Sequence, residues 1–366
     1  MRLKTLEKSG KGVILALLGA LLKSRPLDRK DLLNHRLERI LIVRQDERLG
    51  NLILITPFLE ALRHLLPCAH LAALVSSRFA SVLHGNPDVD EIIPFDKRMF
   101  IRHPFRFMVF VHCLRRKVFD LAIDCGPVDG LSLNNAVMTY LSGAPARLGY
   151  LRGQSHLFLN QWVPRPREAR SEIDYHLDLL RFTFGGFHNG RLKVCLSAQE
   201  KERVAQLQKD WGLTDGDLLV GIHVGGRGQK RWPAERFVQL AQHIIRDHGA
   251  KVLLFWGPGE HGLVRQLENG AHRDLLIAPP LEIRELAGHL QRCTVFISGD
   301  TGPMHLALAV GTPTIAIFRV ANLQRYGSQG PHNRIVFRPG GDVPVGDVLA
   351  AFRDLLRVLT RECSGA

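Results

Sequence analysis

The stretch Ser298-Gly-Asp-Thr-Gly-Pro-Met-His-Leu-Ala-Leu-Ala309 joins a strand pattern to a helix pattern. The residues at 294–298 are apolar and β-rich, and the Ala/Leu-rich run 304–310 after Pro303 is typical of a helix closed by Gly311. In open parallel sheets ligands collect at the carboxyl ends of strands, and the N-terminus of a helix favours an anion. The stretch therefore predicts a binding loop.

Four residues of this loop are candidate ligand contacts. Asp300 can accept hydrogen bonds from hydroxyl groups, and Thr301 and the backbone of Gly302 can donate them. His305, in the first helical turn, can point back toward a ligand. The alternative is that Asp300 or Thr301 only caps the helix, which is common at such junctions. Binding is favoured because a cap needs one polar residue and this loop offers several.

The rest of the chain alternates short apolar strand patterns with helix patterns. In the first half we expect strands at 40–43, 71–75, 91–94, 121–124 and 147–150, and in the second half at 218–223, 251–256, 275–278, 294–298, 313–318 and 334–337. Such alternation indicates βαβ units and parallel sheets, and 366 residues suffice for two cores. The sequence therefore predicts an α/β protein with two doubly wound domains.

Three segments between these patterns have distinct expectations. The helix pattern after the first strand spans 52–64 and contains Pro57. The segment 151–171, with its prolines and arginines, predicts a long loop at the mouth of a cleft, where an acceptor could be held. A closing helix at 347–359 could cross back to the first domain.

The chain is strongly basic, with a net charge of +14 and a pI near 9.9. This charge indicates an anionic partner, which could be nucleic acid, a phosphorylated substrate or an acidic membrane surface. Only 7% of the residues are aromatic and no compact recognition motif occurs, which argues against nucleic acid. The six cysteines lack CxxC pairing and metal-ligand spacing, which favours reduced thiols in the cytoplasm and predicts no metal site.

The N-terminus combines an apolar run at 12–22 with flanking lysines and arginines. No small-x-small cleavage site follows the run, and it is shorter than the ~20 residues that a spanning helix needs. Two expectations for this run stay open. It could form a helix that lies on an anionic membrane surface, or a helix that packs on the protein's own surface.

The residues Asp300-Thr-Gly-x-x-His305 resemble the signature of the heptosyltransferase family, glycosyltransferase family 9. The similarity extends from about Arg39 to the final helix. It implies the GT-B architecture and an inverting, metal-independent transfer without a cofactor, with heptose from ADP-heptose as the first-choice donor. It also implies a lipid-linked acceptor of the lipopolysaccharide core and work at the inner face of the cytoplasmic membrane. The alternatives are a family member that uses another nucleotide sugar for a surface glycan and a non-catalytic sugar-nucleotide binding protein.

The resemblance also assigns residues in three further loops. Lys230 resembles the family's phosphate-contacting lysine, and the surrounding glycines would let backbone N–H groups approach an anion. Glu260 resembles the glutamate that holds the ribose, although a carboxylate at a helix start is an equal alternative. The family's presumed base follows Gly50, but here that residue is Asn51, which has no useful basicity and could still orient the acceptor hydroxyl by hydrogen bonding. Asp46 is therefore the candidate base, with Glu47 in reserve; Asp46 could instead be an ion-pair partner of a neighbouring arginine.

The chain is expected to divide into four parts. Residues 1–38 form the basic and apolar extension, 39–190 the acceptor-side domain, 191–345 the nucleotide-sugar-binding domain, and 346–366 the closing helix.

Overall fold

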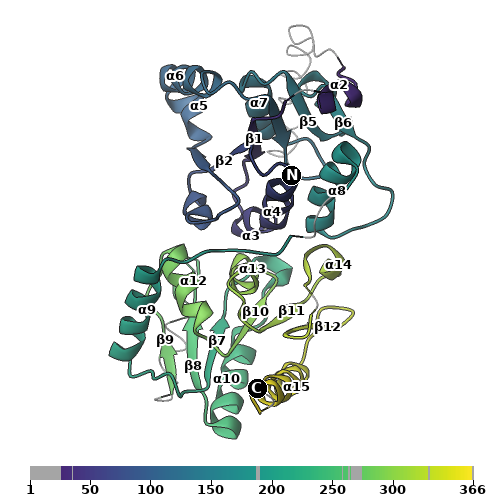
Figure 1. Cartoon of the computed structure of the whole chain (residues 1–366). Helices are drawn as coiled ribbons and strands as arrows, with labels where there is room; N and C mark the ends of the chain where they lie inside the picture. Colours follow the sequence, from purple (N-terminus) through teal and green to yellow (C-terminus); the bar gives the residue numbers. More distant parts are fainter. Residues whose placement is uncertain are drawn as a thin grey trace.

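A computed structural model describes residues 26–34, 36–186, 190–257, 259–262, 264, 274–328 and 330–364. The chain forms two six-stranded sheets, in the order β3-β2-β1-β4-β5-β6 and β12-β11-β10-β7-β8-β9. All of the strand pairs within them are parallel. Each sheet, with the helices around it, forms one lobe, and the two lobes lie one above the other (Figure 1). The predicted α/β class with two doubly wound domains is confirmed, while the boundaries predicted for the four parts stay predictions.

The first lobe consists of the described residues from 26 to the end of α8. Its strands are β1 Arg39–Arg44, β2 His70–Ser76, β3 Glu91–Phe95, β4 Leu121–Asp124, β5 Ala146–Tyr150 and β6 Gln161–Val163. Its helices are α2 Arg29–Asn34, α3 Leu49–Ile53, α4 Thr56–Leu65, α5 Arg98–Arg102, α6 Pro104–Arg115, α7 Leu133–Leu141 and α8 Glu172–Phe184, with short 3₁₀ turns at Ala80–Leu83 and Ser155–Leu157.

The second lobe begins after the connection from α8. Its strands are β7 Leu219–His223, β8 Lys251–Phe255, β9 Leu275–Ile277, β10 Val295–Gly299, β11 Thr314–Phe318 and β12 Asn333–Phe337. Its helices are α9 Ala198–Asp210, α10 Ala234–His248, α12 Ile283–Gln291, α13 Gly302–Ala309, α14 Leu323–Tyr326 and α15 Val345–Ser364, with a 3₁₀ turn at Gly228–Lys230.

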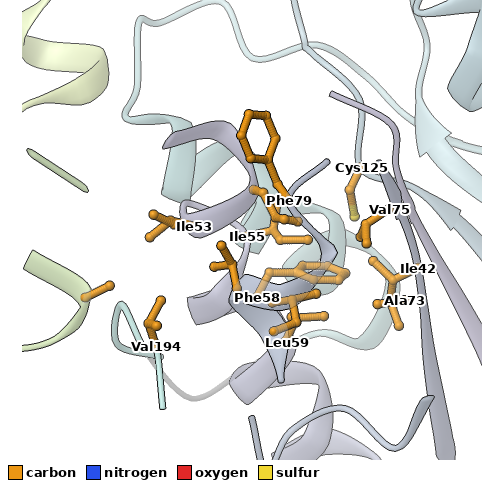
Figure 2. Close-up of a cluster of buried hydrophobic side chains, with 14 of the residues drawn as sticks. Ile42, Ile53, Ile55, Phe58, Leu59, Ala73, Val75, Phe79, Cys125 and Val194 are labelled. Atoms are coloured by element: carbon orange, nitrogen blue, oxygen red, sulfur yellow. The ribbon is translucent and has the colours of Figure 1, made fainter. Parts of the chain in front are cut away.

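The core of the first lobe explains why its strands are apolar throughout. Strand β1 lies between β2 and β4, and Ile40 to Val43 are completely buried because helices cover both faces of the sheet. Figure 2 shows Ile42, Ala73 and Val75 of the sheet beside Phe58 and Leu59 of α4. Burial on both faces fixes the position of the strand, so the loop that follows β1 leaves the sheet at a defined point.

Three expectations from the sequence were wrong. The pattern at 52–64 forms two helices, because Pro57 lies in the first turn of α4 and the hydroxyl of Thr56 donates to the carbonyl of Ile53. The predicted loop 151–171 contains β6, whose three residues are too few to show a strand pattern. Helix α15 does not cross back; it packs on α10, β11 and β12 of the second lobe, where Phe352 and Leu355 join the core.

In the described parts of the chain, no helix is long and apolar enough to cross a membrane. The apolar run at 12–22 lies outside the described residues, so the two expectations for it stay predictions.

Candidate active site between the lobes

Two strand-to-helix junctions, one from each lobe, meet at the boundary between the lobes. Helix α3 follows the central strand β1, and α13 follows the central strand β10. A Cβ atom added to Gly50 would lie 2.5 Å from Cδ2 of His305, and one added to Gly302 would lie 3.0 Å from Cβ of Leu49. Glycine at both helix starts therefore lets the two helices approach closely.

The Asp300 carboxylate lies at the centre of the second-lobe side of this contact. The side chain of Lys230 donates to Oδ2 of Asp300 in an ion pair, and Nδ2 of Asn322 donates to the same oxygen over 2.6 Å. The Lys230 ammonium also lies 5.5 Å from the ring centroid of Tyr326. Lys230 and Asp300, which were predicted as site residues in two separate loops, thus form an ion pair at the N-terminus of α13.

Thr301 and His305 frame this pair. Thr301 is the residue before α13, but its side chain makes no capping hydrogen bond; its hydroxyl lies 3.0 Å from Oγ of Ser298 and 3.5 Å from Nδ1 of His223. Burial lowers the pKa of His305 to about 4, and the positive charge of Lys230 acts in the same direction against the effect of Asp300. His305 is therefore a neutral imidazole at pH 7. Its Nδ1 is buried and has no hydrogen-bond partner among the described residues.

Glu260 lies in the loop after β8 and faces the glycine-rich loop after β7. Its Oε2 accepts from the backbone N–H of Gly257 over 2.7 Å, and its Oε1 lies 3.3 Å from Nη2 of Arg231. A Cβ atom on Gly225 would lie 3.1 Å from Oε1. The carboxylate is thus held against the basic loop, and the ribose role expected for it stays a prediction.

On the first-lobe side, Asp46 and Asn51 contact each other directly. Nδ2 of Asn51 donates to Oδ2 of Asp46 over 2.6 Å, and the backbone N–H of Arg48 donates to Oδ1 over 3.0 Å. Nη2 of Arg44 lies 3.5 Å from Oδ2, so the expected ion-pair partner is present as well. The Asp46 side chain is 18% exposed, so it is not fully enclosed by these partners.

No pattern in the sequence indicates an ionic cluster that connects the two lobes. Glu172, at the start of α8, has an almost fully buried carboxylate between Arg44 of the first lobe and Arg325 of the second, with N–O distances of 3.4 Å and 2.7 Å. Arg325 also pairs with Asp129. Despite the burial of its guanidinium, these carboxylates raise the pKa of Arg325. Arg325 lies on the four-residue helix α14, and no motif surrounds it that could have revealed this role.

A pocket of about 330 Å³ lies beside this cluster, between the segment 165–170 of the first lobe and α14 of the second. The predicted cleft-mouth segment 151–171 therefore does line a pocket. Most of its charged side chains are arginines, which suits an anionic molecule. The charged residues that line it are Asp129, Arg165, Arg167, Glu168, Arg170 and Arg325.

The two parallel α/β lobes have helix N-termini, a lysine–aspartate pair and an arginine-lined pocket at their boundary, and this arrangement suits an anionic ligand. The chain belongs to glycosyltransferase family 9 (heptosyltransferase), whose family model matches residues 108–341. It is therefore a glycosyltransferase.

Individual relatives agree with this membership. The chain is 23% identical over 335 residues to lipopolysaccharide heptosyltransferase 1 of Escherichia coli O18:K1:H7, which covers 83% of this chain and 93% of the relative. Among solved structures, a family 9 glycosyl transferase from Veillonella parvula has a TM-score of 0.78 at 24% identity, over 88% of this chain and 99% of that one. The E. coli heptosyltransferase WaaC with ADP has a TM-score of 0.70 at 20% identity, over 87% and 99%. The fold is thus that of the family, which confirms the GT-B arrangement.

Proposed function

We propose that this protein transfers heptose from ADP-heptose to an acceptor of the lipopolysaccharide core, with inversion and without a metal ion. The observation that carries the proposal is the pairing of Lys230 with Asp300 at the start of α13, opposite Asp46 and Asn51 across the α3–α13 contact. A nucleotide diphosphate needs cations and N–H groups, and an acceptor hydroxyl needs a base. The relative in E. coli named as a lipopolysaccharide heptosyltransferase supports the choice of donor and acceptor.

In this proposal the donor binds in the second lobe. Its diphosphate contacts the Lys230 ammonium and the backbone N–H of Gly302, while Asp300, Thr301 and His305 contact the sugar-diphosphate. Neutral His305 suits such a contact, because an imidazole at pH 7 can accept or donate a hydrogen bond. Glu260 accepts from the two ribose hydroxyls.

The acceptor binds on the first-lobe side, and Asp46 removes the proton of its hydroxyl. The oxygen then attacks the anomeric carbon, and the bond from that carbon to the diphosphate breaks with its electron pair on the leaving phosphate oxygen. Attack from the face opposite the leaving group inverts the configuration. Asn51 orients Asp46 through the 2.6 Å hydrogen bond. The lipid-linked acceptor places the reaction at the cytoplasmic face of the inner membrane.

The test is a thermal-shift panel of ADP-heptose, other ADP-sugars, UDP-sugars and GDP-sugars. A donor that binds only the folded state must raise the melting temperature. We expect the largest rise with ADP-heptose, followed by turnover on a lipopolysaccharide core acceptor that lacks heptose. A larger rise in melting temperature with a UDP- or GDP-sugar, together with turnover of that sugar, would show that the donor is not ADP-heptose.

A further inference from the structure

Helix α6 is apolar on the side that faces the sheet and also on the side that faces outward. Its inner residues Phe107 and Phe110 pack against Phe95 of β3, with ring centroids 6.1 Å and 5.1 Å apart. Its outer residues Phe105 and Met108 are 72% and 60% exposed. A surface helix normally carries polar residues on its outer face, so the fold of this chain does not account for the outer side of α6.

Helix α5 extends the same apolar surface. Phe100 is 58% exposed, and its ring stands edge-on to that of Phe107 at 5.0 Å. We call this region the α5–α6 surface. It consists of the exposed apolar residues Phe100, Phe105, Met108 and Val109 and the exposed basic residues Arg98, Arg102 and Arg106.

The charge of this region has one sign. From Lys97 to Val118 the sequence contains lysines, arginines and histidines but no aspartate or glutamate. The carboxylates that reach these residues come from outside the segment: Asp96 pairs with Arg98, Glu47 with Lys97 and Glu91 with Lys117. Large apolar side chains among arginines match the boundary of an anionic bilayer. There the acyl chains can contact the phenylalanine rings, and the anionic headgroups can pair with the guanidinium groups.

The position of the surface connects it to the acceptor side of the site. Helix α6 lies at the outer end of the first lobe, away from the second sheet (Figure 1). Yet α5 begins after β3, at the same edge of the sheet as the loop of Asp46, and Nζ of Lys97 lies 3.5 Å from Oε1 of Glu47 in that loop. A bilayer in contact with α5 and α6 would therefore lie beside the acceptor half of the cleft.

We propose that the α5–α6 surface docks this protein on an anionic lipid bilayer. The proposal rests on the proposed function in one respect, because a lipid-linked acceptor explains why the site lies next to this surface. Lipid binding itself needs no sugar, so the two proposals can fail separately.

The test is co-sedimentation of the full-length protein with vesicles of phosphatidylcholine alone and of equimolar phosphatidylcholine and phosphatidylglycerol. The apolar variant is Phe105→Ser with Met108→Ser, and the charge variant is Arg102→Glu with Arg106→Glu. The matched controls are Phe182→Ser, another exposed phenylalanine, and Arg353→Glu with Arg357→Glu on the exposed side of α15. All of the altered side chains are exposed, so we expect unchanged melting temperatures.

We expect binding to the anionic vesicles only, a decrease of roughly tenfold or more in the partition coefficient for both α5–α6 variants, and a change below about twofold for both controls. When anionic vesicles are added to the wild-type protein, amide hydrogen exchange should slow in peptides from 98–115. This slowing is expected even if another segment of the chain also contributes to vesicle binding. Equal partitioning of variants and controls with unchanged exchange in 98–115 would overturn the proposal. So would a wild-type dimer in solution that the Phe105→Ser, Met108→Ser protein cannot form, because a second copy would then cover the surface.

Discussion

The Asp46 carboxylate has three polar neighbours. It accepts hydrogen bonds from Asn51 and from the backbone of Arg48, it lies near Arg44, and part of its side chain is exposed. These contacts fix the position of the carboxylate in the loop after β1. In the proposed mechanism the same carboxylate removes the proton of the acceptor hydroxyl.

We predict that Asp46→Asn lowers turnover by the ~10²–10⁴-fold typical of lost general-base catalysis, while donor affinity is nearly unchanged. Turnover and donor affinity are measured separately. The control is Glu47→Gln, which removes a neighbouring carboxylate that pairs with Lys97 instead. Full turnover of Asp46→Asn, combined with higher activity of Asn51→Asp than of the starting protein, would show that Asp46 is not the base.

Lys230 and Asp300 are predicted to carry donor binding. Replacing either by alanine removes a charge-assisted hydrogen bond and should weaken donor affinity by roughly 1.5–3 kcal/mol. Isothermal titration with ADP-heptose measures this, and Arg353→Ala in the same lobe serves as the control for lost positive charge. If both variants stay folded and bind the donor as tightly as the wild type, the donor site lies elsewhere.

Among the elements, α3 and α13 determine how the lobes meet. Each follows the loop after a central strand of its sheet, and each has a glycine in contact with the other helix. The contact leaves no room for a methyl group at Gly50, since the imidazole of His305 is buried against it. Small changes at this contact should therefore affect both stability and the alignment of the two half-sites.

We predict that Gly50→Ala destabilises the protein by about 1–3 kcal/mol, the range for inserting a methyl group into a packed contact, and also lowers turnover. The matched control is Gly346→Ala in α15, where a Cβ atom meets nothing within 4 Å. Because alanine favours a helix over glycine, the control should stabilise by a few tenths to about 1 kcal/mol. Urea unfolding measures both, and equal effects of the two substitutions would contradict the close α3–α13 contact.

At the scale of the whole molecule, the buried Glu172 carboxylate connects the lobes beside the more exposed Arg325–Asp129 pair. It pairs with Arg44, whose side chain is fully buried, so its removal leaves that guanidinium with the Asp46 carboxylate, 3.5 Å away, as its remaining ionic partner among the described residues. One hydrophobic cluster contains residues of both lobes, such as Ile53 and Leu306, so apolar packing and this ionic cluster together fix one lobe against the other.

We predict that Glu172→Gln destabilises the protein by roughly 3 kcal/mol or more, as expected when one partner of a buried ion pair is lost. The control is Asp354→Asn, which breaks the exposed pair with Arg334 and should cost less than about 1 kcal/mol. Both free energies come from urea unfolding. A cost for Glu172→Gln as small as that of the control would mean that the cluster does not hold the lobes.

Stability should also fall as the pH is lowered from 7 to 5. Burial lowers the pKa of His223, His289 and His305 to about 4, assisted by Arg292 in the case of His289, whereas an unfolded histidine titrates near 6.5. Between these values the unfolded chain binds more protons, so the stability is fully present above pH 6.5 and is lost on acidification. Each histidine contributes roughly 1.4 kcal/mol per pH unit within this window.

Unfolding free energies at pH 7 and pH 5 measure this dependence. His289→Gln should decrease the slope, and His243→Gln, at a half-exposed position on α10, should leave it unchanged. A slope that is the same in the wild type and in His289→Gln would show that His289 does not stay neutral in the folded state.

The sequence alone determined the two-sheet α/β fold and the loops that carry the candidate site. Completely apolar runs such as 40–43 require burial on both faces, and each run is followed by a loop and a helix, so the order of elements follows from local patterns. Among the elements that were missed, β6 and α14 have three and four residues, and so few residues carry no period.

Only the tertiary structure decided which loops meet. Lys230 pairs with Asp300, and Arg44 and Arg325 share Glu172, across sequence separations that no local pattern records. It also decided that α15 packs on the second lobe, because an amphipathic helix specifies an apolar face but not the surface that will cover it. Pairing between distant charges depends on where the strands end in space, and that is fixed by the packing of the cores.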